Sequence, residues 1–212
     1  TSGIAIFDLL FADQFDFNED ISSWDTSQAI SMYGMFWGTL FNQDISYWDV
    51  SNVQNMENMF TWSNFNQNIN SWDVSSVTNM NYMFDYTPFN QDLSSWDTSS
   101  VTTMSMMFND SNFNQPIGGW DVSNVLDMSG MFGNTPFNQE IGGWDVSWVN
   151  NMSYMFYNSN FNRNINSWNI VSVTTTEEMF GQSSFNQPLN NWDVSNVTNM
   201  YNMFNGGNSS FN

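Results

Sequence analysis

Residues 65–84 read FNQNINSWDVSSVTNMNYMF, and this stretch recurs with small changes along nearly the whole chain. Eight phenylalanines, from Phe17 to Phe185, recur at every twenty-fourth position. Eight tryptophans keep the same spacing, namely Trp24, Trp48, Trp72, Trp96, Trp120, Trp144, Trp168 and Trp192. A fixed period of this length is typical of a solenoid, in which each repeat is one coil that buries its apolar residues against its neighbours.

The 212 residues are therefore expected to form a single solenoid domain, residues 1–212. Residues 17–208 are expected to form eight coils, each with the 24-residue period. Residues 1–16 are expected to form an N-terminal half-coil or cap, and residues 209–212 to begin a further coil.

Each coil contains two patterns of apolar residues. From Ser71 to Ser75 polar and apolar residues alternate, which predicts a strand with one buried face. From Met80 the apolar positions follow the spacing i, i+3, i+4 (Met80, Met83, Phe84), which predicts a short helix. The expected fold class is thus an α/β repeat solenoid with a parallel sheet on one face and short helices on the other.

The core spacing supports a leucine-rich-repeat-like coil. The apolar residues of that core are Ile69, Trp72, Val74 and Val77. Their spacing is that of the leucine-rich-repeat core, and the 24-residue period lies within the same class. The alternative is a parallel β-helix, which does not need the helical spacing of the methionines.

The composition excludes several classes of function. The chain has 21 acidic residues and one basic residue, Arg163, for a net charge of −20, so nucleic acids are not expected as partners. Because histidine, cysteine and lysine are absent, no enzyme activity is expected. No apolar run approaches the ~20 residues that span a bilayer, so membrane insertion is not expected.

One column of aspartates is a candidate metal site: Asp25, Asp49, Asp73, Asp97, Asp121 and Asp145. The first interpretation is that each carboxylate accepts hydrogen bonds from the backbone of the Asp-x-Ser turn that follows it. The second is that Ca²⁺ lies between coils, because oxygens ~2.4 Å from an ion on either side match a ~4.8 Å step. A second acidic column is interrupted by Asn68 and Pro116, so no complete ligand set repeats. Calcium is the only cofactor that the sequence suggests.

The seventh coil departs from the pattern at Arg163, Asn169, Glu177 and Glu178. One interpretation is local charge compensation, in which Arg163 pairs with a nearby acid. The other is a recognition patch on an otherwise uniform surface.

The two ends are candidate assembly surfaces, because neither carries a charged cap. The apolar residues concerned are Ile4, Ile6, Phe7, Leu10, Phe11 and Phe211. The chain opens late in one coil and closes early in another, so a second copy would complete its end. This predicts head-to-tail association into a homopolymer, or else an N-terminal cap on a monomer.

The repeat also resembles a known family. Residues 41–60 read FNQDISYWDVSNVQNMENMF, a unit that resembles the repeat of BspA-like bacterial surface proteins and mycoplasma-type repeat lipoproteins. The resemblance covers residues 17–204. It implies an extracellular or surface-anchored protein used in adhesion or recognition and without catalysis. The lipidated cysteine anchor that is common in such proteins has no counterpart here, since the chain has no cysteine.

These observations predict a non-catalytic extracellular surface protein for adhesion or recognition, with a protein or a glycan as its ligand. The alternative is a self-assembling structural protein that forms head-to-tail filaments, with or without calcium.

Overall fold

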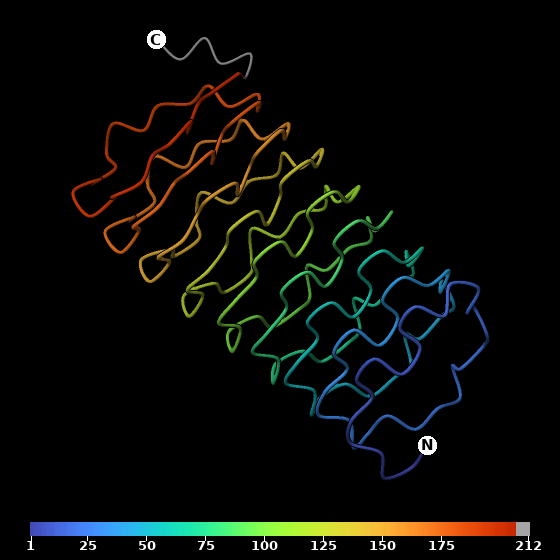
Figure 1. The fold of residues 1–212 in the computed structure, drawn as a ribbon. Helices are drawn as coiled ribbons and strands as arrows, with labels where there is room; N and C mark the ends of the chain where they lie inside the picture. Colours follow the sequence, from blue (N-terminus) through green and yellow to red (C-terminus); the bar gives the residue numbers. More distant parts are fainter. Residues whose placement is uncertain (207–212) are drawn as a thin grey trace.

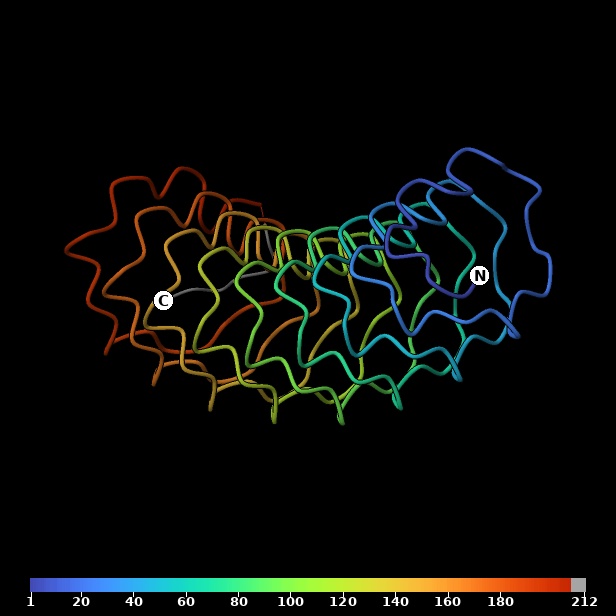
Figure 2. The same ribbon diagram turned by 90° about the horizontal axis from the view of Figure 1, so that it is seen from below.

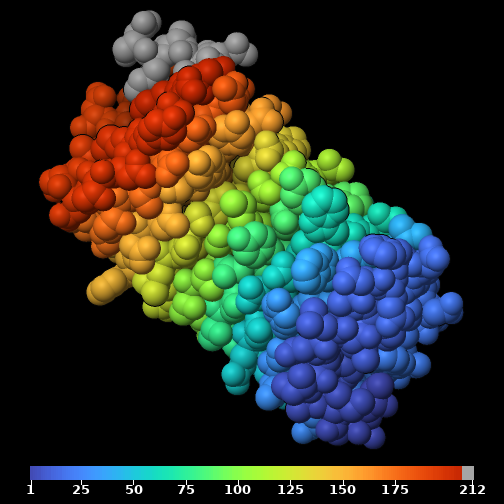
Figure 3. All heavy atoms as spheres, viewed as in Figure 1, coloured from blue at the N-terminus to red at the C-terminus, as the bar shows by residue number. Residues whose placement is uncertain are grey.

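The chain forms a stack of similar coils along one axis (Figure 1). The computed structural model describes residues 1–206, so the expected further coil at residues 209–212 lies outside the described residues. In the space-filling view the coils follow one another as bands of colour from one end to the other (Figure 3). Each coil therefore contacts the coils that precede and follow it in the sequence, as the 24-residue period predicts.

Regular secondary structure is nearly absent from the described part of the chain. Residues 1–206 contain no helix and no named strand. Successive coils pair instead through single parallel bridges at Ile6, Ser31, Asn55, Asn79, Thr103, Asp127, Asn151, Thr175 and Asn199. No helix in this range is long and apolar enough to cross a membrane.

The prediction of a short helix at Met80, Met83 and Phe84 is wrong, because consecutive turns occupy this segment. In the third coil the N–H of Met83 donates to the carbonyl of Met80 (3.3 Å), and the N–H of Asp85 donates to that of Tyr82 (3.1 Å). Tyr82 and Tyr86 have φ values of 57° and 52°, which is left-handed backbone that no α-helix contains.

The remaining amides of these turns connect one coil to the next. The N–H groups of Met80, Tyr82, Phe84 and Tyr86 each donate to a carbonyl of the following coil, at 2.9 to 3.1 Å. We call residues 79–86 and their equivalents in the other coils the turn stack. An α-helix would use these amides internally, whereas the turn stack uses them to bind the following coil. The apolar spacing i, i+3, i+4 is compatible with both arrangements.

The strand expected from Ser71 to Ser75 is confirmed in its burial but not in its pairing. Trp72 and Val74 are buried and Asp73 is exposed, yet no bridge joins this segment to a neighbouring coil. Side chains connect the coils here, as where the indole Nε1 of Trp72 donates to the carbonyl of Ile45 (3.1 Å).

The expected α/β class is therefore not confirmed. A leucine-rich-repeat-like coil needs helices opposite its sheet, and residues 1–206 contain none. A parallel β-helix shares the parallel pairing of successive coils, but here that pairing is limited to one bridge per coil step.

Two stacked phenylalanine columns and one tryptophan column run through the core, beside columns of methionine, valine and isoleucine. Ring centroids of Phe84 and Phe108, beside the turn stack, are 5.6 Å apart. Phe89 and Phe113 are 6.3 Å apart, as are Trp96 and Trp120. The coils thus lie closest where backbone hydrogen bonds join them, and the stack curves along its length (Figure 2).

We predict that Phe108→Ala lowers the free energy of unfolding by about 3–5 kcal/mol, because the fully buried ring packs between Phe84 and Phe132. Urea unfolding followed by tryptophan fluorescence measures the change. Tyr47→Ala removes a ring that is 88% exposed and serves as the control, with a change under about 0.5 kcal/mol. Equal losses in the two variants would contradict the proposed core.

Candidate functional site

Four exposed aromatic side chains lie on successive coils at one edge of the turn stack. We call Phe15, Trp37, Trp62 and Tyr86 the aromatic row; their exposed fractions are 69%, 37%, 59% and 46%. The first three line an open pocket of about 470 Å³ together with Asp13 and Gly38. The rings of Trp62 and Tyr86 stack with centroids 4.4 Å apart. Contiguous exposed apolar surface of this kind marks interaction sites in soluble proteins.

The turn stack explains why the rings of Trp62 and Tyr86 point outward. Each coil has a left-handed residue at this position, and the described members are Asp13, Gly38, Trp62, Tyr86, Asp110, Asn134, Asn158, Gln182 and Gly206. Glycine, asparagine and aspartate adopt this backbone readily, whereas a bulky residue there costs roughly 1–2 kcal/mol. Trp62 and Tyr86 carry this cost while their rings stay largely in solvent. The turn stack imposes the same backbone on bulky residues at its other left-handed position, namely Leu9, Tyr82, Met106 and Tyr154.

Carboxylates adjoin both ends of the row. Asp13 lines the pocket with Phe15 and Trp62. At the other end the charge of Asp110 raises the pKa of Tyr86 above its ordinary value. Asp110 Oδ2 accepts hydrogen bonds from Asn109 Nδ2 (3.0 Å) and from Asn134 Nδ2 (2.9 Å), which hold the carboxylate in place.

A third carboxylate, Asp85, is buried next to the row. Its side chain accepts a hydrogen bond from Asn109 Nδ2 (2.9 Å), and the residue is 7% exposed. Desolvation raises the pKa of Asp85 from 3.8 to about 6, and the charge of Asp110 contributes in the same direction. The potential at this end of the row is thus negative.

A second hollow lies elsewhere, with a volume of about 680 Å³. Its lining is polar and consists of Asp44, Ser46, Gln67, Asn68, Asn70, Ser71, Trp72 and Ser95. Several of these groups already bond one another or nearby groups; Asn70 Nδ2, for example, donates to Asp92 and Ser95 (both 3.2 Å). Because its polar groups serve the contacts between coils, this hollow is a weaker candidate than the aromatic row.

The aspartate column forms turns, as the first interpretation predicted. Each of these carboxylates accepts the N–H of the serine two residues later, at 3.0 or 3.1 Å. The hydroxyl of Ser27 lowers the pKa of Asp25, and serine hydroxyls act in the same way on Asp97 and Asp145. Within residues 1–206 no three acidic side chains gather around one point that would hold a metal ion. Calcium between the coils stays a prediction.

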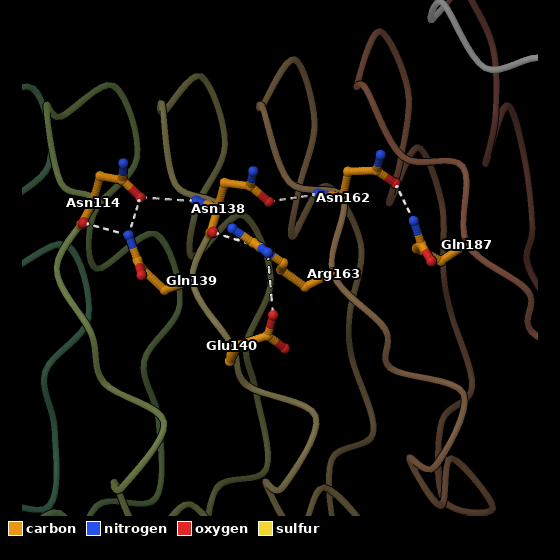
Figure 4. A network of polar contacts seen from close by, with 7 residues as sticks. All are labelled: Asn114, Asn138, Gln139, Glu140, Asn162, Arg163 and Gln187. Atoms are coloured by element: carbon orange, nitrogen blue, oxygen red, sulfur yellow. Dashed lines mark hydrogen bonds and ion pairs between the residues drawn. The ribbon is translucent and has the colours of Figure 1, made fainter.

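Arg163 forms the ion pair that charge compensation predicts. Its Nη1 lies 3.2 Å from Glu140 Oε1, and its Nε donates to the carbonyl of Asn138 (2.8 Å). In the preceding coil Gln139 Nε2 makes the equivalent bond to the carbonyl of Asn114 (2.9 Å), so Arg163 replaces a glutamine in a structural column (Figure 4).

The same view shows a ladder of asparagines. The N–H of Asn138 donates to Asn114 Oδ1 (2.9 Å), and that of Asn162 donates to Asn138 Oδ1 (3.0 Å) (Figure 4). This bond repeats 24 residues apart from Asn18 to Asn186. Each side-chain oxygen thus satisfies a backbone amide of the next coil.

The other unusual residues of the seventh coil have separate partners. Asn169 Oδ1 accepts the N–H of Val171 (3.3 Å), as the aspartates do in their turns. Glu177 accepts hydrogen bonds from the Tyr154 hydroxyl (3.0 Å) and Asn199 Nδ2 (2.9 Å), and Glu178 accepts one from Asn202 Nδ2 (3.1 Å). Within residues 1–206 these hydrogen bonds go to partners other than Arg163, so a common recognition patch stays a prediction.

The N-terminal candidates for assembly divide into two groups. Phe7 is buried, and Phe11 stacks on Phe17 with centroids 3.7 Å apart, so the chain itself covers both. Ile4, Ile6 and Leu10 are exposed. Phe211 lies outside the described residues. Head-to-tail association stays a prediction.

The aromatic row was not expected from the sequence. A signal was present in the sequence, since three of the eleven tryptophans, Trp37, Trp62 and Trp148, fall outside the 24-residue column. Tryptophans that interrupt a repeat are not needed by its core. That Trp37 and Trp62 lie together on the coil edge while Trp148 does not is visible only in the structure.

We predict that Asp85→Asn removes a pH dependence of stability. Below pH 3.8 the carboxyl is neutral in both the folded and the unfolded protein, whereas above about 6 the folded protein must bury its charge. The free energy of unfolding of the wild-type protein therefore falls, by up to about 3 kcal/mol, as pH rises through this window. The amide that replaces the carboxylate would still accept the bond from Asn109.

Urea unfolding of both proteins at a series of pH values measures this effect. The exposed aspartates with a lowered pKa act at lower pH, in the opposite direction, and are present in both proteins. The difference between the two curves therefore isolates Asp85. If the free energies of unfolding of the two proteins changed in parallel from pH 4 to pH 7, the pKa of Asp85 would not be raised by burial.

Comparison with protein families gives matches along the whole chain. A model described as "Mycoplasma protein of unknown function, DUF285" matches residues 1–86, 41–136, 61–160 and 109–212. These overlapping matches confirm a repeat family without singling out the BspA-like members. Comparisons with curated proteins and with solved structures find no match. The chain therefore belongs to the DUF285 family of mycoplasma-type repeat proteins.

Proposed function

We propose that this chain is a non-catalytic recognition protein that acts outside the cell and binds its partner through the aromatic row. The observation that carries the proposal is the exposure of four rings on one edge, two of them on left-handed backbone. An exposed tryptophan ring offers a large rigid contact area at little cost in conformational entropy, and such residues dominate binding energy at interfaces.

The regular coil supports the proposal by holding the rings at fixed spacing. Each ring belongs to a different coil, and hydrogen bonds of the turn stack connect those coils. The N–H of Trp62 donates to the carbonyl of Asp85 (3.0 Å), and that of Tyr86 donates to the carbonyl of Asn109 (2.9 Å). A partner that spans several rings would thus meet a preorganised surface, which reduces the entropy lost on binding.

The absence of histidine, cysteine and lysine supports a role without catalysis. The resemblance of the repeat to BspA-like surface proteins and mycoplasma-type lipoproteins supports a place outside the cell. In this proposal the repeats form an elongated solenoid that presents one binding edge.

A double variant, Trp62→Asn with Tyr86→Asn, tests the role of the row. Asparagine occupies the same left-handed position at Asn134 and Asn158, so the turns keep their backbone. We predict that the wild-type protein binds a set of ligands on arrays of glycans and surface peptides, and that the double variant loses these signals.

Trp148→Asn is the matched control. It removes a tryptophan that is 66% exposed but lies outside the row, and Asn124 and Asn196 occupy the equivalent position in other coils. The control should retain the wild-type signals. If all three proteins gave the same signals, or if the wild-type protein bound nothing, the aromatic row would not be the recognition surface.

A further inference from the structure

We propose that the aromatic row binds an extended peptide segment that carries arginine side chains. This inference rests on the proposed function and specifies the chemistry of the partner. It follows from three observations: the faces of the rings, the carboxylates at the two ends of the row, and the charge of the whole molecule.

The exposed rings suit a planar cation. A guanidinium group stacks on the face of tryptophan or tyrosine and is attracted by the negative charge density of that face. Trp62 and Tyr86 already stack on one another with an interplanar angle of 16°, and both remain about half exposed. Trp37 and Phe15 extend the surface around the pocket.

The carboxylates are placed for salt bridges with such a partner. Asp13 is exposed in the pocket, and Asp110 lies beside Tyr86 at the other end of the row. Arginine can donate two parallel hydrogen bonds to a carboxylate, which adds orientation to attraction. The four coil steps between Asp13 and Asp110 cover roughly 20 Å at ~4.8 Å per step, the length of about six extended residues.

The charge of the molecule favours a cationic partner over a neutral glycan. The net charge is −20, and the single basic side chain, Arg163, pairs with Glu140 outside the row. A basic peptide is attracted from a distance by this field, whereas a neutral sugar gains nothing from it.

The test uses a blocked octapeptide of alternating arginine and glycine as the probe, with binding measured by isothermal titration calorimetry. The same peptide with citrulline in place of arginine keeps the planar group but lacks the charge. Cellotetraose serves as the neutral glycan. We expect the arginine peptide to bind, the other two probes not to bind, and added salt to weaken the binding.

The variants locate the binding site. The double variant Trp62→Asn with Tyr86→Asn should bind the arginine peptide about tenfold more weakly, through the loss of two stacking contacts. Asp13→Asn, made in the wild-type protein, should weaken binding of the arginine peptide by a few-fold. Trp148→Asn should bind the peptide like the wild-type protein. Circular dichroism of each variant confirms that the fold is intact.

Each remaining outcome has a defined meaning. If citrulline peptide or cellotetraose bound through Trp62 and Tyr86, the cationic partner would be wrong while the recognition function would stand. If the arginine peptide bound the double variant as tightly as the wild type, the attraction would be unspecific and the proposed site wrong. If no probe bound, this inference would be wrong, and the array experiment alone would decide the recognition function.

Discussion

The hydrogen bonds between successive turn stacks are the interaction on which the rest of this structure depends. Alternate amides of each stack donate to the following coil, while the amides between them close turns inside the coil. This division requires left-handed residues at regular positions, such as Tyr82 and Tyr86. It also fixes the distance between coils at one edge, and the phenylalanine rings next to that edge stack closely as a result.

Outside the turn stack the coils are joined in a different way. Just before the turn stack one further backbone bond joins successive coils, as from the N–H of Thr78 to the carbonyl of Gln54 (2.9 Å). On the rest of the coil side chains supply many of the contacts between coils. The indole of Trp72 donates to the carbonyl of Ile45, and the asparagine column passes a hydrogen bond from each coil to the next. Among residues 1–206 every fully buried side-chain nitrogen and oxygen has a hydrogen-bond partner. The asparagines of this column therefore have a structural role.

The same geometry exposes side chains at one edge of the stack. The turn stack places two left-handed residues on each described coil, and the second of them is the position that Trp62 and Tyr86 occupy. In most coils it is a glycine, asparagine, aspartate or glutamine. The substitution of Trp62 and Tyr86 at two adjacent coils makes a stacked aromatic pair without disturbing the core. A repeat protein can thus change the side chains at this edge by single substitutions while its scaffold stays the same.

Some of these features could be predicted from the sequence and others could not. The 24-residue period, the burial of Trp72 and Val74, the turns at the aspartates and the ion pair of Arg163 were predicted correctly, because each depends on local spacing or on a single charge. The helix at Met80, Met83 and Phe84 was wrong, since turns bonded to a neighbouring coil place the same positions inward. The aromatic row was missed because the left-handed backbone that exposes Trp62 and Tyr86 follows from this bonding.

The most direct test of the hydrogen bonds between turn stacks is a measurement by nuclear magnetic resonance of scalar couplings across hydrogen bonds in isotope-labelled protein. The account predicts couplings from the amide nitrogens of Tyr82, Phe84 and Tyr86 to the carbonyl carbons of Ser105, Met107 and Asn109. Couplings from these amides to carbonyls four residues earlier would show a helix and would contradict it.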